Sequence, residues 1–176
     1  RHIWLGVSVE DQVTADERIP LLLQTPAVVK FVSYEPALGM VDFSGYQPFL
    51  AVMNPGSLIA LKGVAQAINW LIIGGESGPR ARPCDLAWIR SAIQQCQVAK
   101  VPVFVKQLGT NIRASGRDLH GWPITTASGL SCDTNYSPPR VFARHKKGGD
   151  PAEWPMDLRV REWPSQCEGA GMKAKP

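Results

Sequence analysis

Three carboxylates and one amine stand where extended segments of this chain end. Glu10, Glu35 and Glu76 each close such a segment, and Lys106 lies near the end of a fourth. Side-chain alternation places the four groups on one side of their segments. Carboxylates that meet an ammonium group can bind a cation, hold an amine or transfer protons. A structural ion-pair network is the alternative, but we predict these four as catalytic residues because sites gather at the carboxyl ends of parallel strands.

A second set of residues is predicted to bind a ligand. Gly74, Gly75 and Ser77 form a glycine-rich turn, in which backbone N–H groups can hold a phosphate or a carboxylate, and Arg80 follows closely. A tight turn that only requires glycine explains the pattern equally well. No Gly-Lys-Ser/Thr follows, so this is not a P-loop. The predicted ligand-binding residues are Ser8, Ser33, Gly74, Gly75, Ser77 and Arg80.

Helices are predicted between the extended segments. Thr14 and Glu17 have the spacing of a capping box, so a helix is expected to start at Thr14, with a kink or restart at Pro20. Asp85 is expected to cap an amphipathic helix that ends near Ala99. Strand and helix alternate with about 30 residues per unit, which implies a parallel sheet. The four strands are expected at residues 3–10, 29–35, 70–76 and 102–107.

The two faces of this sheet differ in polarity. One face is rich in valine, whereas the other carries small and polar residues such as Ser8 and Ser33, which also fit a crowded barrel interior. This favours a (β/α) barrel over a doubly wound sheet, which needs apolar residues on both faces. The predicted fold is α/β: a partial (half) TIM-like barrel with parallel strands at 1–109, an insertion at 40–68, an irregular C-terminal extension at 110–164 and a disordered tail at 165–176.

A half-barrel has two unpaired strand edges, which implies a partner. A missing N-terminal half, another chain or the C-terminal tail is expected to cover them. The chain also begins with Arg-His and has no initiator Met, which suggests a piece of a longer protein.

The composition is that of a globular domain of 176 residues, with 44% hydrophobic residues and a net charge of +4. Such a charge permits contact with nucleic acid without requiring it. The four cysteines have no Cys-x-x-Cys spacing, and no metal site is predicted. Free thiols and the lack of a long apolar run indicate a cytoplasmic protein that does not contact membranes.

Six long segments of the chain carry a family resemblance. They are WLGVSVEDQ, ADERIPLLLQTPA, FVSYEPALG, NWLIIGGESGPRARP, VPVFVKQLG and GGDPAEWPMDLRVREWP. In this order they resemble the C-terminal half of a phage-associated family of unknown function, and they cover most of residues 3–109 and 148–164. Full-length members of that family look like radical-SAM barrels with a three-cysteine motif near the N-terminus.

The resemblance implies an iron–sulfur cluster and S-adenosylmethionine as cofactors of the full-length family. No cofactor is supported by this chain itself, because none of Cys84, Cys96, Cys132 and Cys167 matches the motif by spacing. What the resemblance implies for this chain is the second wall of the barrel mouth, which contacts the adenosyl group and the substrate in radical-SAM barrels.

Three functional hypotheses follow. The first is the C-terminal portion of a phage or prophage radical-SAM-like enzyme of unknown substrate, active only together with the missing half. The second is a non-catalytic binding module for a phosphate-bearing ligand, nucleic acid or a protein partner. The third is a truncated remnant without activity.

Overall fold

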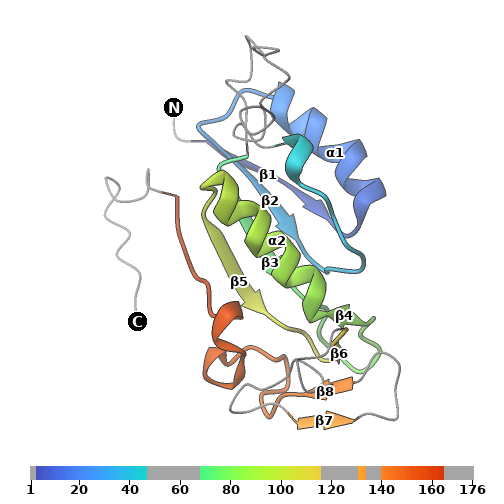
Figure 1. Cartoon of the computed structure of the whole chain (residues 1–176). Helices are drawn as coiled ribbons and strands as arrows, with labels where there is room; N and C mark the ends of the chain where they lie inside the picture. Colours follow the sequence, from blue (N-terminus) through green and yellow to red (C-terminus); the bar gives the residue numbers. More distant parts are fainter. Residues whose placement is uncertain (1–2, 47–67, 116–130, 134–139, 165–176) are drawn as a thin grey trace, which may run out of the picture.

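The structure, a computed structural model, describes residues 3–46, 68–115, 131–133 and 140–164. These residues form a central sheet, two helices and a smaller sheet beyond the carboxyl ends of the central strands (Figure 1). Most of the predicted insertion at 40–68 and the predicted tail at 165–176 lie outside the described residues.

Four parallel strands make up the central sheet, in the order β1-β2-β3-β5. Their bounds are Trp4–Val9 for β1, Val29–Tyr34 for β2, Trp70–Gly74 for β3 and Val103–Gln107 for β5. The predicted strands and their parallel direction are therefore confirmed. No closed barrel is present among the described residues, so the half-barrel stays a prediction.

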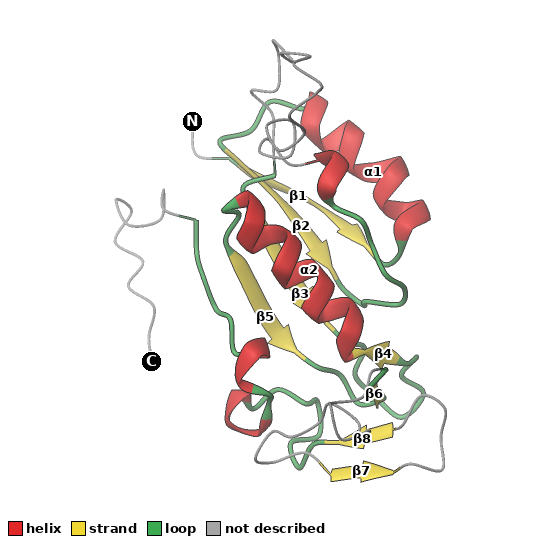
Figure 2. Cartoon of the chain, in the orientation of Figure 1, coloured by secondary structure: helices red, strands yellow, loops and turns green. Residues whose placement is uncertain are grey.

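Both helices pack on the same face of the central sheet (Figure 2). Helix α1 spans Gln12–Gln24 and α2 spans Leu86–Ala99. Alternate strand residues point at the helices and form one apolar core with them, because side chains of a strand alternate between its two faces. Core residues include Val9, Val32, Ile73 and Val105 from the strands and Ile19, Leu22, Ile89 and Cys96 from the helices. Neither helix is long and apolar enough to cross a membrane.

The caps explain where the helices begin. Asp11 is the N-cap of α1: its carboxylate accepts the backbone N–H of Thr14 at 2.9 Å, and the Thr14 hydroxyl accepts that of Asp11 at 3.1 Å. The predicted start at Thr14 was wrong, because Thr14 is the third residue of the helix. Residues 12–24 form one helix through Pro20. The predicted cap of α2 is confirmed, since Asp85 accepts the N–H of Ala87 at 2.9 Å.

Neither α1 nor α2 covers the opposite face of the sheet, which is called the helix-free face because no helix of the described residues lies on it. Near the amino ends of the strands this face carries an aromatic cluster with Trp70 at its centre, and ring centroids of neighbours lie 4.9–6.2 Å apart. Trp70 is buried, whereas Trp4 is 38% exposed and Trp163 is 48% exposed. The members of the cluster are Trp4, Phe31, Trp70, Phe104 and Trp163.

The C-terminal part of the chain is more ordered than the predicted irregular extension. A small sheet has the order β4-β6-β8-β7, with bounds Cys84–Asp85, Ile112–Arg113, Arg140–Phe142 and Ser131–Asp133 respectively. Two 3-10 turns, Pro151–Glu153 and Met156–Leu158, follow β8, and the Asp150 carboxylate caps the first turn by accepting the N–H of Ala152 at 2.9 Å.

The last described segment lies along the outer edge of β5. The N–H of Val105 donates to the carbonyl of Val160 at 2.9 Å, and the N–H of Glu162 donates to that of Val103 at 2.7 Å. Phe104 and Arg161 form an antiparallel bridge between these pairs. The outer edge of β5 is therefore covered by residues 160–162 of the chain itself. The β1 edge has no strand partner other than β2 among the described residues.

Candidate functional site

The parallel strands bring the predicted catalytic residues to one edge of the central sheet. Glu10 follows β1, Glu35 follows β2, Glu76 follows β3 by two residues, and Lys106 lies near the end of β5. The three carboxylates do not all pair with Lys106, because each of them has a different basic partner. The structure therefore corrects the expected arrangement, in which three acids met one amine.

Glu35 and Lys106 form the pair that the sequence predicted. The Lys106 Nζ lies 3.3 Å from Glu35 Oε2, and the Ser33 hydroxyl donates to the same oxygen at 3.2 Å. The Glu35 side chain is 18% exposed and that of Lys106 is 56% exposed. The pair thus joins β2 to β5 across β3 with one accessible charged end.

Gly74 makes room for this pair. A Cβ at Gly74 would lie 2.2 Å from Glu35 Oε1, so the carboxylate occupies the space that a side chain would fill. The absence of a side chain at Gly74 therefore admits Glu35, and the predicted ligand binding by Gly74 stays a prediction. The carboxylate and Gly74 belong to the helix-free face, like Ser33.

Glu76 is held by an arginine of its own loop. Arg82 donates Nε to Oε2 at 2.8 Å and Nη2 to Oε1 at 3.2 Å, and its backbone N–H adds a third bond at 2.8 Å. The hydrogen bonds from the Arg82 side chain and backbone lower the pKa of Glu76. This bidentate geometry stabilises the ionised form of Glu76. Its catalytic role stays a prediction.

Glu10 is held by helix α1. Arg18 Nη1 lies 3.2 Å from Glu10 Oε2 and also donates to the Ser8 carbonyl at 2.9 Å. The pKa of Arg82 is raised mainly by Glu76, and the nearby negative charge of Glu10 adds a smaller contribution. Glu10 and Glu76 therefore share an arginine-rich part of the edge, separate from the pair of Glu35 and Lys106.

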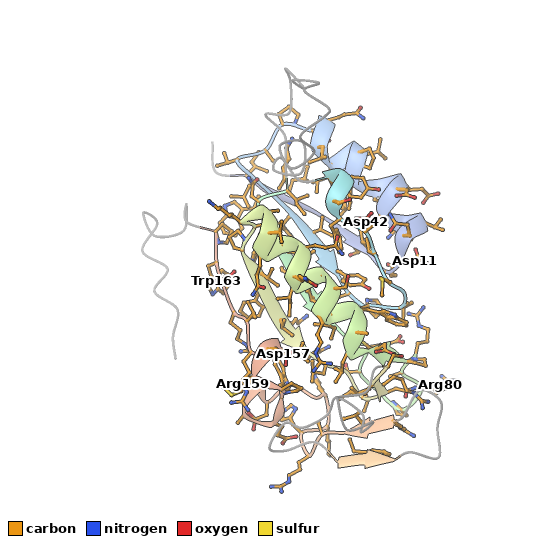
Figure 3. The ribbon with its side chains drawn as sticks, in the orientation of Figure 1. Asp11, Asp42, Arg80, Asp157, Arg159 and Trp163 are labelled. Carbon is orange, nitrogen blue, oxygen red and sulfur yellow. The ribbon has the colours of Figure 1, made fainter. Side chains whose placement is uncertain are left out.

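The other predicted ligand residues have different surroundings. Ser8 is exposed and lies beside Ser33 in the β1–β2 register. A Cβ at Gly75 would lie 2.2 Å from the Leu108 carbonyl oxygen, so this glycine serves close backbone packing. Arg80 is exposed at the periphery of the molecule (Figure 3). Ser77 is exposed and lines a cavity.

Three further residues matter at this edge and were not singled out as site residues. Arg18 and Arg82 bind two of the predicted acids. Each arginine lies within eight residues of its acid in the sequence, and this short spacing is the signal that points to the pair. Lys147 belongs to the basic run Arg144–Lys147, whose Gly-Gly ending marks a turn. That turn is docked at the sheet edge, since the Gly109 N–H donates to the Lys147 carbonyl at 3.1 Å.

The charged side chains at this end of the sheet can bind a ligand of opposite charge. A carboxylate with a lysine and a serine hydroxyl can hold a substrate amine or carboxylate or relay a proton between them. Among the residues that the structure describes, no group of three or more His, Cys, Asp and Glu side chains is placed to hold a metal ion.

The fold and the site define an α/β protein with a polar site at the carboxyl ends of the strands of a parallel sheet, whose described helices pack on one face. The chain belongs to the family described as protein of unknown function DUF5131, whose model matches residues 1–159. No curated protein matches the chain, and no solved structure matches it.

Proposed function

We propose that this chain forms one wall of the mouth of a partial (β/α) barrel, in a phage or prophage enzyme that is radical-SAM-like and acts on an unknown substrate. The observation that carries the proposal is the one-sided sheet. The helices that the structure describes, α1 and α2, pack on one face, whereas the helix-free face bears Ser8, Ser33, Glu35 and Lys106 at the carboxyl ends of its strands. The interior of a barrel has this distribution, and its functional sites lie at this end.

Two further features support a barrel interior. Trp4 and Trp163 leave large apolar surfaces exposed on the helix-free face, and additional barrel strands would enclose such surfaces. The β1 edge, which has no outer partner in the described part of the chain, offers backbone groups to a further parallel strand.

The cysteines that the structure describes do not fit an iron–sulfur cluster. Cys84 and Cys96 are buried in the apolar core, with exposures of 1% and 0%. Burial, with a smaller contribution from the neighbouring Asp85 charge, raises the pKa of Cys84 to about 12. Cluster ligands have to be thiolates. A cluster in this protein therefore requires ligands outside the described residues, and the proposed role of this chain is confined to substrate contact.

In this role Glu35 is the charged centre of the wall. Lys106 and Ser33 orient its carboxylate, and the exposed Lys106 side chain is accessible on one side to a substrate anion. The experiment is anaerobic iron and sulfide reconstitution of the protein with its native flanking sequence, followed by absorbance spectroscopy and assay of S-adenosylmethionine cleavage. Lack of both a cluster and cleavage would refute the radical-SAM-like assignment.

A labelling experiment tests the barrel interior independently. Ser8→Cys should react rapidly with a bulky maleimide in the isolated chain and slowly in the protein with its flanking sequence, in a background where Cys132 and Cys167 are replaced by Ser. Glu17→Cys is the matched control, because Glu17 is exposed on α1 and should react rapidly in both. Equal rates at Ser8→Cys in the two proteins would contradict the barrel.

A further inference from the structure

A cavity of about 610 Å³ lies between the loop after β3 and the segment that follows β8. One side is formed by Ser77, Gly78 and Pro79, and the other by residues 140–147. This volume is within the range of about 300–1,000 Å³ that small-molecule sites occupy. The cavity is separate in its residues from the pair of Glu35 and Lys106.

Four basic side chains, those of Arg140, Arg144, Lys146 and Lys147, line this cavity, and no aspartate or glutamate is among its described lining residues. Arg140, Arg144, Lys146 and Lys147 make no ion pair with a carboxylate within the described part of the chain. Unpaired like charges that face one cavity repel one another, so an anion bound there relieves their repulsion.

Arg140 gives a second, independent indication. Its Nε is buried and has no hydrogen-bond partner among the described residues. A buried donor left without an acceptor costs free energy, so a ligand acceptor that reached this nitrogen would stabilise the arrangement. A phosphate oxygen is an acceptor of the right charge.

The basic turn is held rigidly in place by its backbone. The Gly148 carbonyl accepts the Leu108 N–H and the Trp154 Nε1–H, each at 2.9 Å. Glu153 accepts the backbone N–H groups of Arg144, at 2.5 Å, and His145, at 3.2 Å. These contacts use main-chain atoms of the turn, so the charged ends of its side chains stay available to a ligand.

Part of the remaining lining is apolar or aromatic. Phe142, Pro79 and Ala143 line the cavity, and Phe142 is 40% exposed with the Arg140 guanidinium 5.0 Å from its ring centroid. Cations next to an aromatic surface match a ligand that combines phosphate with a planar base. We propose that this cavity binds a nucleotide, with its phosphates on the cations of residues 140–147 and its base against Phe142.

The proposed phosphate site involves the end of the glycine-rich turn that was predicted to bind a phosphate. Gly74 and Gly75 serve packing, whereas Ser77 and Gly78 contribute to the cavity wall. The nucleotide site does not rest on the barrel proposal, because none of its residues belongs to the helix-free face of the central sheet.

The test measures fluorescence polarisation of a fluorescent adenosine triphosphate analogue titrated with the whole chain. Lys146→Gln and Lys147→Gln should each weaken binding about fivefold, as expected for the loss of one partly exposed charge contact. Lys100→Gln is the control of equal charge change: Lys100 is exposed at the end of α2 and should leave the affinity unchanged. Circular dichroism checks that each variant is folded.

A second variant tests the base contact. Phe142→Ala should weaken the nucleotide about tenfold while leaving competition by inorganic triphosphate unchanged, because one base stack contributes about 1–3 kcal/mol. The proposal is overturned if the probe does not bind, or if Lys100→Gln weakens it as much as Lys147→Gln. It is also overturned if an oligonucleotide binds far more tightly than the nucleotide and Phe142→Ala has no effect.

Discussion

The glycine after β3 offers a sharp test of how the carboxyl edge is built. A Cβ at Gly75 would lie 2.2 Å from the Leu108 carbonyl oxygen and 3.0 Å from the Gly109 Cα. Ordinary non-bonded contacts lie at about 3.5 Å, so in Gly75→Ala the two backbone segments must separate by about 1 Å. Neither neighbour is a flexible side chain, and the strain cannot be relieved by a rotamer change.

Separation of these segments also removes hydrogen bonds. The Gly75 N–H donates to the Gln107 carbonyl at 3.0 Å, and the Thr110 N–H donates to the Glu76 carbonyl at 2.9 Å. Overpacking costs about 1–3 kcal/mol, and each lost hydrogen bond costs about 1 kcal/mol. We therefore expect Gly75→Ala to lower the free energy of unfolding by about 3–5 kcal/mol.

Urea denaturation followed by circular dichroism measures this change, and Gly74→Ala is the matched control. The Cβ added there meets the end of the Glu35 side chain at 2.2 Å, which can rotate away. The control should cost about 1 kcal/mol of stability, together with the contact between Glu35 and Lys106. Equal costs for the two variants, or a cost at Gly75 within about 1 kcal/mol of zero, would refute the reasoning.

Three further outcomes are expected. The pKa of Glu76 lies below its ordinary value of 4.5, so the contribution of ionised Glu76 to folding stability is present above pH 4.5 and is lost as the pH falls through the folded pKa. Arg82→Gln should raise this pKa in an NMR titration, and an unchanged pKa would contradict the pairing. Asp11→Ala should cost about 1 kcal/mol in urea denaturation, and the exposed Glu17→Ala much less; similar costs would argue against the cap. Cys84, whose pKa burial raises to about 12, should resist alkylation at neutral pH until the protein unfolds, as peptide mass spectrometry reports; rapid labelling of folded protein would show that the thiol is not buried.

Much of the central sheet followed from the sequence because period-two alternation is a local signal. Val103 and Val105 point to the core while Phe104 and Lys106 point to the helix-free face, as their order along the strand requires. The same parity placed Glu35 and Lys106 together, although they are 71 residues apart in the chain.

The rest of the site depended on choices that alternation does not encode. Arg18 and Lys106 were both possible partners of Glu10. Glu10 pairs with Arg18 because of the direction of α1, and strand parity does not encode this. Glu76 lies two residues beyond its strand, in a loop where Arg82 is nearer. Parity fixes a side chain only within the strand itself.

The C-terminal extension was predicted less well for a related reason. Its strands β6 and β8 have two and three residues, too short for any periodicity. The basic turn reaches the sheet edge through backbone contacts with Leu108 and Gly109, which depend on glycine geometry in two distant segments. Gly109 and Gly148 both have positive φ, at 87° and 57°, and approach each other closely.

The antiparallel segment at Val160–Glu162 determines at which edge the central sheet can accept another strand. It occupies the hydrogen-bonding groups on the outer side of β5, so no parallel strand can be added there without displacing it. Any enlargement of the sheet has to begin at β1. In the proposed barrel, this segment would prevent β5 from pairing directly with a closing strand, and a substrate would have lateral access to Lys106.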